Sequence, residues 1–187
     1  MQQLLNQINQ FYSITTNASQ ALENCLVRLE LYKNDFLITE GKKCTHLYFL
    51  EHGALRGYYN LDGKEVTHWF AFENDFVTSF HGFITNEPCV ENIQLLEHGI
   101  VWAIEKNKLE ALYDQHPDLE RLVRIVYEKY YIRLEERYVN AQFKTATQLY
   151  DDLMKHMPHI LQRVPLGHIA SYLGLSQETL SRIRGKH

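Results

Sequence analysis

The chain has 187 residues, of which 45% are hydrophobic and 22% are charged, and its formal net charge is −4. This length allows one large domain or two small ones, and the hydrophobic fraction is typical of a packed globule rather than of a disordered chain. The sequence contains no run of eighteen apolar residues and no charged leader followed by an apolar segment, so we expect no membrane span and a cytoplasmic protein.

Two helices are predicted at the start of the chain, over residues 1 to about 29. Apolar side chains recur there at spacings of three and four, from Leu4 to Leu29, with a break at residues 15–17. We expect both helices to pack on the domain that follows.

Between Leu31 and about Ile104 the sequence changes to short alternating runs separated by turn residues. We predict strands over residues 47–50, 55–60, 66–72, 93–96 and 100–104. Asp62-Gly63, between the second and third of these runs, is a strong signal for a hairpin turn. Strands at this spacing predict an antiparallel sandwich or jelly roll.

Two further helices are predicted, a short one over residues 106–116 and a long one from Pro117 to about Tyr138. The long helix carries an apolar stripe with alternating three- and four-residue steps, made of Leu119, Val123, Val126, Tyr130 and Leu134. A core helix of a monomer would also carry such a stripe. Because this one is narrow for so long a helix, we interpret it as the seam of a homodimer. One more helix is expected over residues 145–156.

The segment from Leu166 to Arg184 predicts two short helices joined by a sharp turn. Gly174 stands where the chain must turn, and Ser176 is a suitable N-cap for the second helix. The small residue Ala170 lets the two helices cross closely. This pattern is typical of a helix-turn-helix, whose second helix enters the major groove of DNA, although an ordinary helical hairpin of a bundle remains the alternative.

The DNA-facing residues predicted from this segment are polar or basic. They are Ser176, Gln177, Glu178, Thr179, Ser181, Arg182, Arg184 and Lys186. From Ile160 to His187 there are four basic residues, the fourth being Arg163, against one acid, so the C-terminal end is positive although the chain is acidic. The expected class is therefore α+β, divided into a β-roll with N-terminal helices over 1–116, a dimerisation helix over 117–140 and a DNA-binding domain over 141–187.

This order of elements resembles the cyclic-AMP receptor protein/Fnr (Crp/Fnr) family of bacterial transcription regulators over nearly the whole chain. The matching positions are Gly41, Gly53, Asp62-Gly63, Asn74-Asp75-Phe76, Pro117-Asp118 and Ile169-Ala170 through Arg182. The resemblance implies a cyclic-nucleotide-binding-like jelly roll, a long dimerisation helix and a helix-turn-helix. It also implies a homodimer on two-fold symmetric double-stranded DNA, with RNA polymerase as a further partner.

The recognition helix carries the closest part of the resemblance. Residues 176–182, SQETLSR, are similar to the S-R-E-T-x-x-R of the family. By that carry-over Glu178 reads a cytosine amino group and Arg182 reads a guanine, which are sensible pairings on chemistry alone. Gln177 replaces the family's first arginine, so the half-site is expected to differ at that base. The chain stops at His187, so the contacts of the β-wing that follows in the family are expected to be missing.

The nucleotide pocket is where the sequence departs most from the family. Counted from Asp75-Phe76, the positions of its Gly-Glu pair hold Thr78 and Ser79, and those of its Arg-Ser pair hold Cys89 and Val90. The pair that touches the base falls near Leu134 on the long helix. Without the arginine a buried phosphate lacks a charge-assisted partner, so we expect no cyclic-AMP binding.

Two possibilities remain open for this pocket. Its aromatic neighbours, Phe80 among them, favour an apolar or aromatic effector, or the pocket is filled by its own side chains. The three cysteines, Cys25, Cys44 and Cys89, are scattered and too few for an iron–sulfur cluster of the Fnr type, so plain thiols and no metal are expected. We predict no cofactor.

An enzyme is not expected. A cupin-like metal centre needs an HxH pair, which is absent from the sequence, and there is no phosphate-binding glycine loop or nucleophile elbow. The alternative to a DNA-binding regulator is a dimeric ligand-sensing β-roll protein with weak or lost DNA binding. The polar side chains kept on the second helix favour the regulator.

Overall fold

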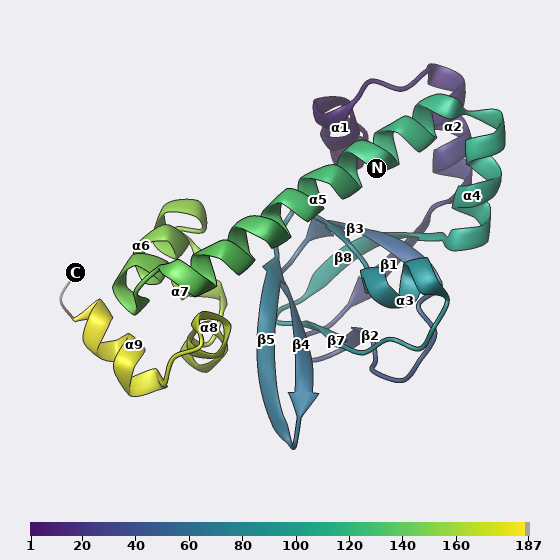
Figure 1. Ribbon diagram of the computed structural model, residues 1–187. Helices are drawn as coiled ribbons and strands as arrows, with labels where there is room; N and C mark the ends of the chain where they lie inside the picture. Colours follow the sequence, from purple (N-terminus) through teal and green to yellow (C-terminus); the bar gives the residue numbers. More distant parts are fainter. Residues whose placement is uncertain (186–187) are drawn as a thin grey trace.

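The computed structural model describes residues 1–185 and shows a β-roll with helices at its N-terminal end, one long helix crossing it, and a C-terminal helical unit (Figure 1). The strands are β1 (Val27–Leu31), β2 (Phe36–Ile38), β3 (His46–His52), β4 (Leu55–Leu61), β5 (Lys64–Ala71), β6 (Phe76–Val77), β7 (Asn92–Leu95) and β8 (Gly99–Glu105). The helices are α1 (Gln2–Phe11), α2 (Thr16–Cys25), α3 (Phe80–Thr85), α4 (Lys106–Gln115), α5 (Pro117–Phe143), α6 (Ala146–His156), α7 (Ile160–Arg163), α8 (Leu166–Leu173) and α9 (Gln177–Arg184). The predicted α+β class is confirmed.

The roll consists of two four-stranded sheets, in the orders β1-β8-β3-β6 and β2-β7-β4-β5, and all the strand pairs that join neighbours are antiparallel. The prediction that placed Leu29 in the N-terminal helical region is wrong, because α2 ends at Cys25 and Leu29 pairs with Val101 in β1. Apolar residues alternate with charged ones from Val27 to Leu31, so the period is two, and β8 supplies the partner strand.

The predicted hairpin turn at Asp62-Gly63 is confirmed. Both residues have positive φ, +51° and +80°, and the turn joins β4 to β5 in register from Leu61 opposite Lys64. This hairpin extends beyond the body of the roll in Figure 1. Strand β5 is the edge of its sheet, so its outer backbone groups are open to another element.

Helix α5 spans 27 residues and continues to Phe143, beyond the predicted end. Its first half is buried by the chain itself: Leu119 is 1% exposed and Val126 is 3% exposed, and both belong to one core with α1, α2 and the roll. Tyr130 donates a hydrogen bond from its hydroxyl to the carbonyl oxygen of Phe76. The apolar stripe therefore serves mainly to dock α5 on its own roll.

A second core, which includes Leu153, Ile160 and Leu180, holds α6–α9 together. Phe70 of β5 belongs to this core, so the helical unit is packed against the roll rather than tethered beside it. Among residues 1–185, the structure contains no helix of the length and apolar character needed to cross a membrane.

Candidate DNA-binding site and the interior of the roll

Helices α8 and α9 form the predicted helix-turn-helix. Gly174 has φ +70°, a conformation that a residue with Cβ rarely adopts, and the amide of Leu175 donates to the carbonyl oxygen of Ala170 to close the turn. The Ser176 hydroxyl accepts a hydrogen bond of 3.2 Å from the amide of Thr179, which confirms the predicted N-cap. Ile169 is fully buried between the helices, so their crossing is fixed by packing.

The outward face of α9 is polar and open to solvent. Its exposed residues are Gln177, Glu178, Ser181, Arg182 and Arg184. Thr179 is half-buried, because its amide and hydroxyl both contact the Ser176 hydroxyl. The pKa of Glu178 lies below its ordinary value, because its own backbone amide and the Ser176 side chain donate to it at the helix N-terminus. Lys186, also predicted here, lies outside the described residues.

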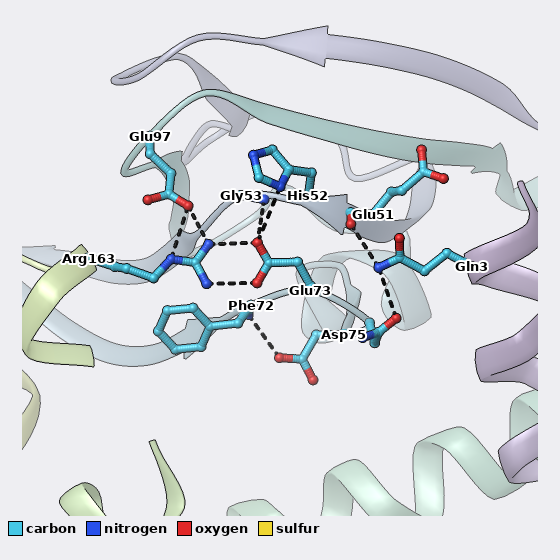
Figure 2. Close-up of polar contacts among 10 residues, drawn as sticks. Gln3, Glu51, His52, Gly53, Phe72, Glu73, Asp75, Glu97 and Arg163 are labelled. Carbon is cyan, nitrogen blue, oxygen red and sulfur yellow. Dashed lines mark hydrogen bonds and ion pairs between the residues drawn. The ribbon is translucent and has the colours of Figure 1, made fainter. Parts of the chain in front are cut away.

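Arg163 does not belong to this face, although its charge was counted there in the sequence. It points inward to the roll, where its guanidinium pairs with Glu73 and with Glu97, as Figure 2 shows. The positive charge of the described part of α9 therefore comes from Arg182 and Arg184, both in its last turn.

Helix α8 covers the edge of β5. The Thr67 amide, which has no neighbouring strand on that side, donates a 3.0 Å hydrogen bond to the Ser171 hydroxyl, and this hydroxyl donates to the carbonyl oxygen of Glu65. The ring of Tyr172 lies 5.2 Å from that of Phe70 and receives the guanidinium of Arg137 on α5 at 4.6 Å. Helix α8 thus covers the open edge of β5 and satisfies two of its backbone groups through the Ser171 hydroxyl.

A buried arginine in β4 strengthens this contact. Arg56 is 3% exposed and donates to Gln94 of β7, to Glu65 of β5 and, over 2.9 Å, to His168 Nδ1 of α8. Burial and the charge of Arg56 lower the pKa of His168. A neutral imidazole suits this geometry, because Nδ1 must keep a lone pair to accept from the guanidinium.

The pocket residues predicted around α3 are brought together, but they fill the space themselves. Thr78, Ser79 and Cys89 are all nearly inaccessible, and the Thr78 hydroxyl lies 3.1 Å from the Cys44 thiol. A Cβ added to Gly82 would lie 3.1 Å from the Cys89 sulfur, so α3 packs tightly on this cluster. Burial raises the pKa of Cys89 to about 11, with a further contribution from Cys44. None of the side chains in this cluster, Thr78, Ser79, Cys44 and Cys89, is basic.

The other predicted pocket residues lie apart from this cluster. Val90 is 44% exposed, and Leu134 is 63% exposed on α5. Phe80 packs its ring against Tyr127 and Tyr130 of α5, with centroids 5.5 and 5.4 Å away. These three residues therefore do not line a common pocket with Thr78, because Phe80 on α3 packs against α5, whereas Val90, in the loop before β7, and Leu134 lie at the surface.

A second self-filled region lies over the β4–β5 hairpin. The Trp69 indole occupies the room beside Gly57, where an added Cβ would be 2.1 Å from its ring. Its Nε1 donates to Glu91, a carboxylate that is 5% exposed and also lies 2.7 Å from His68 Nε2. The ring of Tyr59 stacks on His68 at 4.3 Å. These residues were not predicted as part of the pocket, since only the strand register brings Glu91 to Trp69.

Of the five residues predicted for a dimer seam, only Leu134 is exposed; Leu119 and Val126 are buried in the protomer, and Val123 and Tyr130 are partly buried. That prediction is wrong for Leu119 and Val126, because α1, α2 and the roll cover them. The apolar residues that α5 does expose follow later in the helix. They are Tyr131, Ile132, Leu134, Tyr138, Val139 and Phe143.

We compared the chain with protein families and with known proteins of similar sequence. Residues 28–116 match the family model described as the cyclic nucleotide-binding domain. The Anaerobic regulatory protein of Bacillus subtilis (strain 168) is 29% identical over 98 residues, which are 52% of this chain and 41% of that protein. The match thus spans less than half the length of this relative.

Solved structures share the fold over most of the chain. FixK2 from Bradyrhizobium japonicum superimposes with a TM-score of 0.72 and 18% identity, over 86% of this chain and 83% of that one. A putative transcriptional regulator of the crp/fnr family from Eubacterium rectale ATCC 33656 gives 0.71 and 15%, over 91% and 82%. At these identities the likeness concerns the fold, which this chain shares with both structures over most of its length.

Proposed function

We propose that this chain, which carries a cyclic nucleotide-binding domain within the architecture of the Crp/Fnr regulators, is a homodimeric, sequence-specific DNA-binding transcription regulator that does not respond to cyclic AMP. The observation that carries the proposal is the outward face of α9. Its side chains are exposed and able to bond, on a helix whose inner face is locked to α8. The relatives compared above are named as regulatory proteins, which agrees with a role other than catalysis.

The recognition chemistry is assigned to two side chains of α9. Arg182 has a guanidinium that suits the O6 and N7 acceptors of guanine, and Glu178 is an acceptor for the amino group of cytosine. Both are exposed, one turn apart, and Arg182 has only a weak contact of 3.4 Å with the Thr179 hydroxyl to give up. Ser181 and Arg184 are placed to contact phosphates beside them.

The dimer is held by the second half of α5. Tyr127, Tyr131, Leu134 and Tyr138 follow one another at steps of four, three and four, the heptad spacing of a coiled-coil seam. Tyr131, Leu134 and Tyr138 are each more than 60% exposed in the protomer and follow one stripe of the helix, and a contiguous exposed apolar surface is typical of a protein–protein contact. We therefore place the seam one or two turns further along α5 than the sequence indicated.

The side chains inside the roll support the proposal that cyclic AMP does not bind. The positions that would face a cyclic phosphate form the neutral cluster of Thr78, Ser79 and Cys89, and Glu91 is a buried carboxylate nearby in sequence. A buried phosphate needs a cation or several N–H donors, and its desolvation is expensive without them. Trp69 also occupies space that an aromatic ligand would need. These contacts favour a roll filled by its own side chains.

A selection of random duplex DNA on purified, ligand-free protein at two salt concentrations tests the function. We expect an enriched two-fold symmetric site, with affinity that falls as salt rises. Titration of the same protein with cyclic AMP in a calorimeter should give no binding heat. Failure to enrich any sequence while the protein remains dimeric would leave the alternative, a ligand-sensing β-roll protein without DNA binding.

A further inference from the structure

The helical unit α6–α9 is joined to the rest of the chain through a short connection. Helix α5 ends at Phe143, Lys144 is extended, and Thr145 already caps α6. A two-residue junction of this kind fixes the distance between α5 and α9 but leaves their mutual rotation to other contacts. Besides the contact of Arg137 on α5 with the ring of Tyr172 on α8, those contacts are made with the protomer's own roll.

The first of these contacts is built around Arg163 of α7. Its two terminal nitrogens each donate over 2.7 Å to one oxygen of Glu73, in the turn after β5, and its Nε donates over 3.1 Å to Glu97, in the turn before β8 (Figure 2). The guanidinium also lies 5.0 Å from the ring of Phe72. This is the bidentate geometry that only arginine provides.

Glu73 is also held by a hydrogen bond from the backbone of the roll. The Gly53 amide donates to it over 2.9 Å, and together with Arg163 it holds the pKa of Glu73 at about 2, although burial acts in the opposite direction. The three side chains of this ion-pair cluster, Arg163, Glu73 and Glu97, are between 24% and 32% exposed. Such a partly desolvated, bidentate pair holds an orientation better than an exposed pair does.

The second contact lies at β5, where Arg56 meets His168 and Ser171 meets the strand edge. Helix α7 and helix α8 thus touch the roll at separate places, one at its turns and one at its sheet edge. Together with the junction at Lys144, they define the orientation of the helical unit on the roll. Neither contact covers the outward residues of α9.

We infer that Arg163 is a positioning residue for DNA recognition. Through Glu73 and Glu97 it sets the angle between α9 and the dimer helix α5, and so sets the separation of the two recognition helices in the dimer. Separation in turn selects the distance between half-sites in DNA. This inference rests on the proposed function, and it adds that half-site spacing is chosen by a contact inside each protomer, made by a residue that lies outside α9 and reads no base itself.

The test compares half-site spacing with half-site affinity. Duplexes carry the selected half-site either once or twice, with the spacer shortened or lengthened by one to four base pairs. Wild-type protein should prefer one spacer by about tenfold or more, because both recognition helices can engage only when the geometry matches. Arg163→Ala should reduce this preference to about threefold or less, while affinity for the single half-site stays unchanged.

Matched variants separate positioning from folding. Gln162→Ala changes the exposed neighbour on α7 and should keep the wild-type spacing profile. Glu73→Gln keeps the shape of the partner and should reproduce the effect of Arg163→Ala, even if the arginine variant folds poorly. Arg163→Lys keeps the charge without the fork and should give an intermediate profile.

The outcomes are distinguishable. A wild-type protein that selects no DNA removes the proposed function, and the positioning role with it. A wild-type protein with a sharp spacing preference that both Arg163→Ala and Glu73→Gln retain overturns the inference alone. A uniform loss of affinity for one and two half-sites, with an unchanged spacing profile, would also overturn it, because that result indicates a merely structural contact.

Discussion

The outer face of α9 and the interior of the β-roll are both places where this architecture can receive a partner, yet they are built in opposite ways. On α9, Glu178 and Arg182 are exposed, and the hydrogen bonds that they make within the chain are to their own helix and its N-cap. In the roll, Trp69 and Glu91 bond to each other, and the Glu91 carboxylate is nearly inaccessible. The difference agrees with the proposal that α9 recognises an outside molecule, whereas the side chains of the roll bond mainly to one another.

Removing the side chain of Trp69 from the roll should have a large effect on stability. Trp69→Ala removes a side chain that fills the space over Gly57, and we expect it to lower the free energy of unfolding by about 3 kcal/mol in chemical denaturation. Indole added to this variant should restore part of the loss and should not affect wild-type protein. Trp69→Phe is the matched control, since it keeps a ring and loses mainly the bond to Glu91. A Trp69→Ala protein as stable as the wild type would show that the roll is not filled in this way.

The two halves of α5 extend the comparison to the dimer. Tyr131→Asp combined with Leu134→Asp places charges on exposed positions, so the protomer should stay folded and sediment as a monomer. Glu136→Lys, an exposed change off the heptad stripe, should leave the dimer intact. Val126→Asp should instead unfold the protomer, because it buries a carboxylate in the core shared with α1 and the roll. A double variant that remains dimeric would place the seam elsewhere.

At the DNA end the expected effects are smaller and more selective. Arg182→Ala should cost about 1–3 kcal/mol of binding free energy and relax specificity at one base pair of each half-site. Arg184→Ala should weaken binding to all sequences alike and reduce the salt dependence, as the loss of a phosphate contact does. A binding-site selection on the two variants measures both effects. Equal base preferences for wild type and Arg182→Ala would contradict the assigned guanine contact.

The same contrast separates what could be predicted from the sequence from what could not. The helix-turn-helix is encoded locally: the turn at Gly174, the cap at Ser176 and the apolar spacing lie within about twenty residues, and the structure confirms each of them. Which face of α5 meets the roll depends on α1 and α2, about 110 residues away along the chain, so Val126 was placed on the wrong side.

Polar partners that are far apart in the sequence could not be predicted either, because only the folded chain brings them together. Arg163 has a charge that in sequence counts toward the DNA end, and only the folded chain brings it to Glu73, 90 residues earlier. The short strands β2 and β6 and the helix α3 left no periodic signal, since two to six residues are too few to establish a period. The departure of the pocket from the family was visible, but not that Trp69 fills the space.

The smallest expected effect concerns Ser176, which was predicted to face DNA and also caps α9. Ser176→Ala removes the acceptor for the Thr179 amide and should lower stability by about 1 kcal/mol. Ser176→Asp keeps an acceptor and a favourable charge at the helix N-terminus, so stability should be retained. If Ser176 lies beside the phosphate backbone, this same carboxylate will be repelled, and DNA affinity will fall although the fold is intact. Measuring unfolding and DNA binding for both variants separates the two roles. If Ser176 only caps the helix, Ser176→Asp preserves the cap and the protein keeps its DNA affinity.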